Sequence, residues 1–155
     1  MNNQKLLNIK RKNYRKILML SFDHIIHQLL DLSSYNYFSI EESDQKIDSF
    51  KNIGVKLSSH VYGQMNSFSD VYHILELKKF NPKYVDLLSP EDYSFYFGLI
   101  EIIGFSKLIE DHLITYEPLL HFYDENGNNQ LVLDVYEDNN SYYFEIDTYG
   151  EKWII

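Results

Sequence analysis

Two histidines and an aspartate near the N-terminus have residue types and a spacing that could bind a metal ion. His24 and His27 are three residues apart, and Asp31 follows four residues later. On a helix these steps place all three side chains on one polar face, where two imidazoles and a carboxylate could hold a catalytic metal. The sequence offers no fourth ligand and no general base, and surface helices often carry such residues without a ligand. A metal-dependent enzyme is therefore an alternative hypothesis, and no metal and no cofactor are predicted.

Other patterns that could do chemistry are absent or incomplete. The chain has no cysteine, which excludes disulfides, thiol nucleophiles and Cys-based zinc sites, and its six glycines form no phosphate-binding loop. A stretch from Asp124 resembles the start of an EF-hand calcium loop, but Asn129 stands where glycine is required and Val135 where a bidentate glutamate is required. Glu101 is a lone carboxylate in an apolar run, which would make it a candidate acid only if it were buried. No catalytic residue is predicted.

The most informative charge pattern lies in the C-terminal third. Between Lys107 and Lys152, 44 residues (108–151) contain no Lys or Arg, but eleven Asp or Glu and eight Tyr or Phe. Such a surface repels itself and attracts cationic partners. The plainer interpretation is a solvated face whose acids keep an aromatic-rich protein in solution. Both interpretations stay open at this point.

The net charge of −9 conceals an opposite charge at the N-terminus. The first 16 residues contain six of the 14 bases and none of the 23 acids, so the remainder carries a net charge of −15. Nucleic acid is therefore not an expected partner, because the acidic remainder would repel phosphates. The apolar run over residues 17–22 is too short for a signal peptide, and no run of eighteen apolar residues occurs. We expect a cytoplasmic protein without a membrane partner.

Local patterns predict helices in the first two-thirds of the chain. Apolar residues recur every three or four positions over residues 14–32, which predicts an amphipathic helix, and residues 1–13 are either its helical lead-in or a mobile basic arm. Ser39 and Ser67 begin capping sequences of helices that end at Gly54 and near Phe80, and a short strand is predicted over 55–62. The sequence from Ser89 predicts the start of a helix over 93–105 that is apolar on all faces, followed by another over 106–113.

After residue 118 the pattern changes to strict alternation. Strands are predicted over 119–124, 131–137 and 142–147, joined by turn sequences, with a fourth over 153–155. The predicted fold class is α+β. It is a single domain over residues 1–155, with N-terminal helices packed on a C-terminal antiparallel meander of three to four strands.

The alternation sorts the meander into a buried and an open face. Leu131, Leu133 and Val135 share the face expected to pack on the helices. The opposite face carries the residues predicted to bind a partner, which are Asp134, Tyr136, Asp138, Tyr143, Glu145 and Asp147, with the turn acids Asp124 and Glu125 beside them.

The overall character of the chain resembles that of immunity proteins from bacterial toxin systems, which are short, acidic, cysteine-poor α+β proteins. Secretion chaperones are similar in size and charge. These resemblances rest on no specific motif and imply no particular residue. We therefore expect a non-enzymatic protein that binds and neutralises a basic protein partner, such as a toxin nuclease, with a secretion-type chaperone or the metal-dependent enzyme as alternatives.

Overall fold

The structure is a computed structural model that describes residues 2–32, 34–88, 98–108 and 119–155. In these ranges the helices are α1 (Asn3–Leu29), α2 (Ile40–Ile53) and α3 (Phe68–Leu77). The strands are β1 (Leu30–Leu32), β2 (Tyr35–Tyr37), β3 (Leu57–Met65), β4 (Tyr84–Leu88), β5 (Ile100–Ile102), β6 (Phe105–Leu108), β7 (Leu119–Tyr123), β8 (Gln130–Asp138) and β9 (Ser141–Tyr149). The α+β class is confirmed, but strands and helices are interleaved along the chain.

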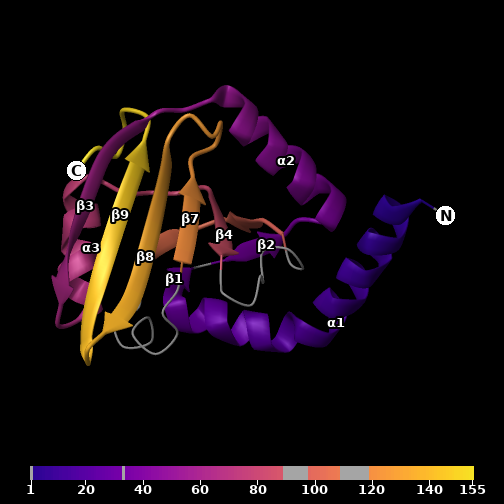
Figure 1. The fold of residues 1–155 in the computed structure, drawn as a ribbon, viewed down its shortest axis with the longest axis horizontal. Coiled ribbons are helices and arrows are strands. Elements are labelled where there is room, and N and C mark those ends of the chain that lie inside the picture. The colour runs from indigo at the N-terminus through magenta and orange to yellow at the C-terminus, as the bar shows by residue number, and fades with distance from the viewer. Residues whose placement is uncertain (1, 33, 89–97, 109–118) are drawn as a thin grey trace.

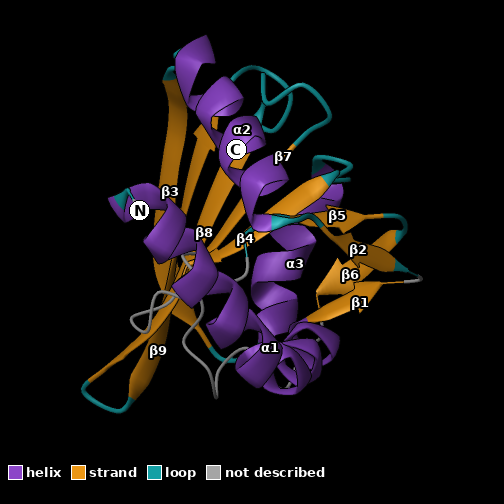
Figure 2. Ribbon diagram, turned by 90° about the vertical axis from the view of Figure 1, so that its right-hand side faces the viewer, coloured by secondary structure: helices purple, strands orange, loops and turns teal. Residues whose placement is uncertain are grey.

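The main sheet has seven antiparallel strands in the order β2-β5-β4-β7-β8-β9-β3. Figure 1 shows most of this order from β3 at one side to β4 and β2 at the other. The predicted meander is present as β7, β8 and β9, but the prediction of three to four strands was too small. Strands from earlier in the chain extend the meander on both sides: β4, β5 and β2 lie beyond β7, and β3 lies beyond β9. Local patterns could not predict these pairings, because the paired strands are far apart in the sequence. Figure 2 shows the separate pair β1–β6 beside β2 and β5.

Apolar cores lie on both faces of this sheet. The larger core contains Leu131, Leu133 and Val135 as predicted, and it is closed by Val71 and Leu75 of α3. The smaller core lies on the opposite face. Alternating residues of β4 and β7 turn toward it, and its members are Phe50, Tyr84, Leu99 and Tyr123 with Phe38 and Ile47 beside them. Helix α2 therefore covers the β4–β7 part of the face on which the predicted binding residues lie.

The ends of α2 and α3 are set by the predicted local signals. The Ser39 hydroxyl accepts a hydrogen bond from the Glu42 amide at 3.1 Å, and Gly54 ends α2 in the left-handed conformation with φ +66°. Asp70 accepts hydrogen bonds from the Ser67 and Asn66 amides at the start of α3. The bounds are nearly those expected, although α3 ends at Leu77 and not near Phe80.

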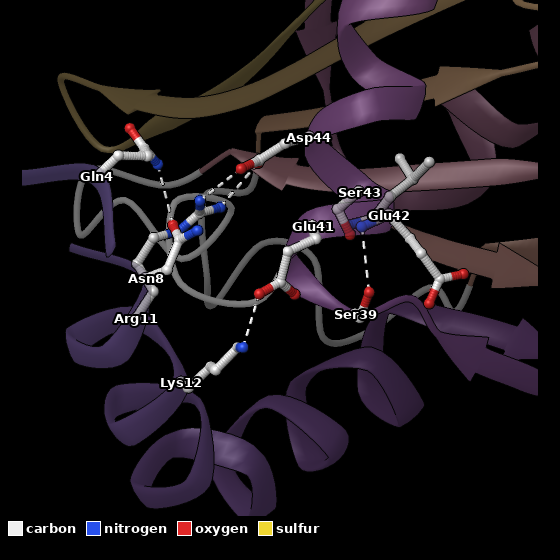
Figure 3. A network of polar contacts seen from close by, with 10 residues as sticks. Gln4, Asn8, Arg11, Lys12, Ser39, Glu41, Glu42, Ser43 and Asp44 are labelled. Carbon is white, nitrogen blue, oxygen red and sulfur yellow. Dashed lines mark hydrogen bonds and ion pairs between the residues drawn. The ribbon is translucent and has the colours of Figure 1, made fainter. Parts of the chain in front are cut away.

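Ion pairs join the basic start of α1 to α2. Arg11 is buried and donates two hydrogen bonds to the Asp44 carboxylate, at 2.7 and 3.0 Å, and Lys12 lies 2.6 Å from Glu41 (Figure 3). Of the residues expected as a helical lead-in or a mobile arm, 3–13 belong to α1. Burial makes the bidentate Arg11 pair the more important contact, since an exposed lysine pair contributes little.

A second polar contact joins α1 to β2. Both Tyr35 and Tyr37 donate their hydroxyl hydrogen to the same carboxylate oxygen of Asp23. The guanidinium of Arg15 lies 5.5 Å from the centre of the Tyr37 ring. Desolvation and the Asp23 hydrogen bond raise the pKa of Tyr35 to about 12, so its hydroxyl stays protonated and keeps donating.

Three predicted elements and one predicted helix end were wrong. The predicted helix over 93–105 contains strand β5 in its described part, and strand β6 occupies the start of the helix predicted over 106–113. The capping sequence at Ser89, which was expected to start the helix over 93–105, lies outside the described residues. Residues 153–155 form no strand; Trp153 is fully buried and packs edge-on against Phe80 at 5.0 Å. The helix predicted to residue 32 ends at Leu29, and β1 follows directly.

Candidate protein-binding face

Strands β8 and β9 bring the predicted binding residues together. Tyr136 lies opposite Tyr143 in the register of the two strands, and Asp134 lies opposite Glu145. Asp147 lies two positions further along β9 on the same face. Asp138 is at the exposed end of β8, where the chain turns into β9.

The edge strand β3 adds residues that the sequence reasoning missed. In the β3–β9 register, Tyr62 lies opposite Glu145, His60 opposite Asp147, and Gln64 opposite Tyr143. The Tyr62 side chain is 71% exposed. We define the acidic tyrosine face as the common side of β8, β9 and β3, formed by Asp134, Tyr136, Tyr143, Glu145, Asp147, His60, Tyr62 and Gln64.

Two stacked rings form the centre of this face. The rings of Tyr136 and Tyr143 are 5.8 Å apart between centroids, with an angle of 20° between their planes. Desolvation, followed by the charges of Glu145 and Asp134, raises the pKa of Tyr136. The Tyr136 hydroxyl therefore remains a neutral hydrogen-bond donor, surrounded by acids, over the whole physiological pH range.

A histidine partly neutralises the face at its β3 side. The Nδ1 atom of His60 is hydrogen-bonded to an Asp147 carboxylate oxygen, and both side chains are partly exposed. This hydrogen bond raises the pKa of His60, with the charges of Asp147 and Glu145 acting in the same direction. The face therefore becomes less acidic when His60 is protonated.

Asp147→Asn is expected to lower the pKa of His60 toward its ordinary value of 6.5, because an amide stabilises the imidazolium less than a carboxylate does. Since the folded pKa is the higher one, the pair stabilises the fold most below about pH 6.5 and loses this effect as pH rises through the folded value. An NMR titration of the His60 ring measures the shift. Asp138→Asn is the control, and an unchanged His60 titration in Asp147→Asn would contradict the assignment of this pair.

The turn acids Asp124 and Glu125 were expected beside this face, but they lie elsewhere. Asp124 accepts hydrogen bonds from the backbone amide and the side-chain amide of Asn129, at 3.3 and 2.7 Å, so its carboxylate holds the β7–β8 turn together. Glu125 and Asp124 lie at the opposite end of β8 from Asp138. They line a polar pocket of about 290 Å³, together with Lys83 and Lys152. The stretch from Asp124 that resembles the start of a calcium loop is a hairpin turn between β7 and β8, as its turn sequence predicted.

A buried polar cluster lies between the acidic tyrosine face and α2. Asp86 is 5% exposed and lies opposite His121 in the β4–β7 register. The His121 ring stacks on Tyr123 at 4.2 Å, and its Nε2 lies 2.9 Å from Oε1 of Gln130. Desolvation lowers the pKa of His121 and raises that of Asp86 to about 7, so both side chains favour their neutral forms. No sequence motif predicted this cluster, because Asp86 and His121 are each the only residue of their own strand that is charged or titrates near neutral pH.

The other chemical candidates lie on several different elements. His24 and His27 lie in α1, but Asp31 lies in strand β1, so the helical spacing assumed for the metal site does not extend to it. Glu101 is in strand β5, opposite Asn36 and Tyr84. Among the side chains that the structure describes, no group of three His, Asp or Glu could hold a metal.

The fold and this face together define an α+β protein with an open acidic surface on one part of an antiparallel sheet. Comparisons with protein-family models, with curated proteins and with solved structures gave no match. None of the helices in the described ranges has the length and apolar character of a membrane span.

Proposed function

We propose that this protein binds a basic protein partner through its acidic tyrosine face and neutralises it, as an immunity protein neutralises a toxin. The observation that carries the proposal is the arrangement at the centre of the face. The stacked Tyr136 and Tyr143 have Glu145 and Asp134 as their neighbours on the same two strands. Two aromatic anchors within an acidic surround suit the recognition of a surface rich in Lys and Arg.

The tyrosines and the acids have different roles in this proposal. The two stacked rings supply contact area at low entropic cost and set the dissociation rate, since each has only two side-chain torsions to immobilise. The acids accelerate the encounter with a cationic cleft and select against acidic proteins. Tyr62 extends the aromatic surface to the sheet edge.

The partner that best suits this surface is a toxin domain with nuclease activity. A nuclease active site is a cationic cleft, and a rigid acidic sheet face can cover it without entering the chemistry. A secretion-type chaperone would use the same surface. The two are distinguished by the partner's activity in the complex: an immunity protein abolishes it, whereas a chaperone that binds outside the active site leaves it intact.

The probe for the test is the small basic C-terminal domain of a secreted protein encoded immediately upstream, which is where we expect the gene of the toxin partner. Tyr136→Ala combined with Tyr143→Ala is expected to weaken binding by about a hundredfold, mainly through faster dissociation. Reversing the charges of Asp134, Glu145 and Asp147 to Lys is expected to slow association and to reduce its dependence on salt. Stopped-flow kinetics or surface plasmon resonance at two salt concentrations measure both effects.

The matched control carries the same change in net charge elsewhere. Asp48, Glu125 and Glu151 are exposed and lie outside the acidic tyrosine face, so their reversal to Lys alters the overall charge equally. Equal association rates for the two triple variants would place the binding surface elsewhere. Loss of binding in the face variant alone supports the proposal.

A further inference from the structure

The outer edge of the main sheet is formed by a long strand with almost no charge. Strand β3 has nine residues, Leu57–Met65, and His60 is its only ionisable side chain apart from Tyr62. It contains no proline and no lysine. In the described part of the chain, β3 pairs only with β9, which leaves the hydrogen-bonding groups along its other side without a strand partner.

Such an edge is unusual for a protein that remains a monomer. Sheet edges are normally protected by short length, charged residues, proline or bulges, because open backbone groups recruit further strands. The opposite edge of this sheet is protected in this way, since β2 has only three residues. The register of β3 is irregular only between Leu57 and Ser59, so the segment from Ser59 to Met65 remains regular.

We infer that the edge strand β3 pairs with β3 of a second copy of this chain, antiparallel about a two-fold axis at Val61. In this register His60 faces Tyr62 of the second copy at two symmetric positions on the exposed side. Val61 faces its own counterpart on the inner side. Imidazole and phenol rings can pack against each other: within one chain the rings of His60 and Tyr62, two positions apart on β3, are 5.8 Å apart. Across the two-fold axis the same ring types would be direct cross-strand neighbours.

The near absence of charge on β3 favours a second copy over a basic partner at this edge. A strand whose only ionisable side chains are His60 and Tyr62 repels a second copy little, and it gives a cationic segment no reason to prefer the edge over the nearby acidic face. The acids Glu145 and Asp147 lie on β9, one strand in from the edge. In the dimer they would be separated from their counterparts by three strand spacings, roughly 14 Å. That separation exceeds the screening length of about 8 Å at physiological salt, so their repulsion opposes pairing only weakly.

This inference goes beyond the proposed function and does not depend on it. Pairing of the edges would join two seven-stranded sheets into one. The two acidic tyrosine faces would then lie on the same side, next to each other, because β3 is part of both.

Sedimentation of the full-length chain from about 1 to 500 µM tests the inference, and a monomer–dimer equilibrium is expected. Tyr62→Lys introduces a cation opposite His60 of the other copy at two positions, and is expected to raise the dimer dissociation constant about tenfold. Ile103→Lys is the control, since this side chain is 51% exposed and follows β5, which lies at the other end of the sheet from β3. Circular dichroism verifies that both variants are folded.

Cross-linking gives a second test, because the chain has no cysteine of its own. Val61→Cys is expected to form a disulfide-linked dimer on mild oxidation, whereas Ile103→Cys, also on the surface, is not. A chain that stays monomeric and unlinked throughout would overturn the inference. Ile17 is 74% exposed on α1. A dimer that Ile17→Lys dissociates and Tyr62→Lys does not would also overturn the inference, since the contact would then lie on α1. A monomer that binds the basic partner refutes only the dimer, and a dimer that binds none refutes only the proposed function.

Discussion

Gly127→Ala is expected to lower the free energy of unfolding by about 2–5 kcal/mol. Gly127 is buried in the β7–β8 turn with φ +73°, and an added Cβ would lie 2.2 Å from Cδ1 of Phe50. The left-handed conformation costs about 1–2 kcal/mol for a residue with a side chain, and overpacking a core contact costs about 1–3 kcal/mol. Phe50 has little room to yield, because its ring stacks on Tyr123 at 4.8 Å.

Gly54→Ala separates these two contributions. Gly54 has a similar φ of +66°, but no atom lies within 4 Å of the Cβ it would gain. Its substitution is therefore expected to cost only the conformational strain, about 1–2 kcal/mol. Urea unfolding of both variants provides the comparison. Equal losses would show that Phe50 moves aside freely, and that the turn does not fasten α2 to the sheet.

This contact shows what local sequence could and could not predict. The turn itself was predictable, because Asn and Gly between alternating apolar runs favour a hairpin. Its contact with Phe50 was not, since nothing near Gly127 identifies a helix far earlier in the chain as its neighbour. The elements that were predicted correctly are those set by neighbouring residues: the Ser39 cap, the Gly54 end and the alternation from Leu131 to Val135.

The apolar run before residue 105 was misassigned for a physical reason. Strand β5 has only three residues, Ile100–Ile102, so its alternation is too short to stand out from the apolar run around it. Periodicity therefore cannot separate such a strand from part of a buried helix. Ile100 and Ile102 are both buried in β5, which lies between β2 and β4. The Ser89 capping sequence favoured the helix, but local signals do not report which strands pair over long distances.

The acidic tyrosine face was predicted only in part. Residues of β8 and β9 are close in sequence, so alternation and a tight turn were sufficient to place Tyr136 beside Tyr143. His60 and Tyr62 join them from β3, a strand that precedes the meander by about a third of the chain, and their pairing follows from sheet topology. The prediction therefore gave the acids without the histidine that partly neutralises them.

Asp86→Asn is expected to raise the free energy of unfolding at pH 8 by about 2–4 kcal/mol. One carboxylate oxygen of Asp86 has no hydrogen-bond partner among the described residues. Burial raises its pKa from the ordinary value of 3.8 to about 7, and the charge of Lys51 opposes this shift. The difference between these pKa values corresponds to about 4 kcal/mol, and an asparagine that is itself imperfectly hydrogen-bonded recovers only part of it.

The pH dependence distinguishes this explanation from a simple packing effect. Because the folded pKa is above the unfolded one, the native protein is most stable below about pH 4 with respect to this group. It loses that stability as pH rises to about 7 and changes little beyond. Asp86→Asn is expected to remove this dependence, and Asp138→Asn, at an exposed position, to leave it unchanged. Chemical denaturation at pH 4, 5.5, 7 and 8 measures all three proteins.

Lys51 provides the sharper test of the sign. Its charge lowers the pKa of Asp86 and also that of His121, so it favours the ionised acid and the neutral base together. Lys51→Met is therefore expected to move the stability transition of Asp86 to higher pH. If Asp86→Asn is instead less stable than the native protein at pH 8, then the buried carboxylate has a stabilising partner when ionised. Asp86 would then form a second charged site, between α2 and the acidic tyrosine face.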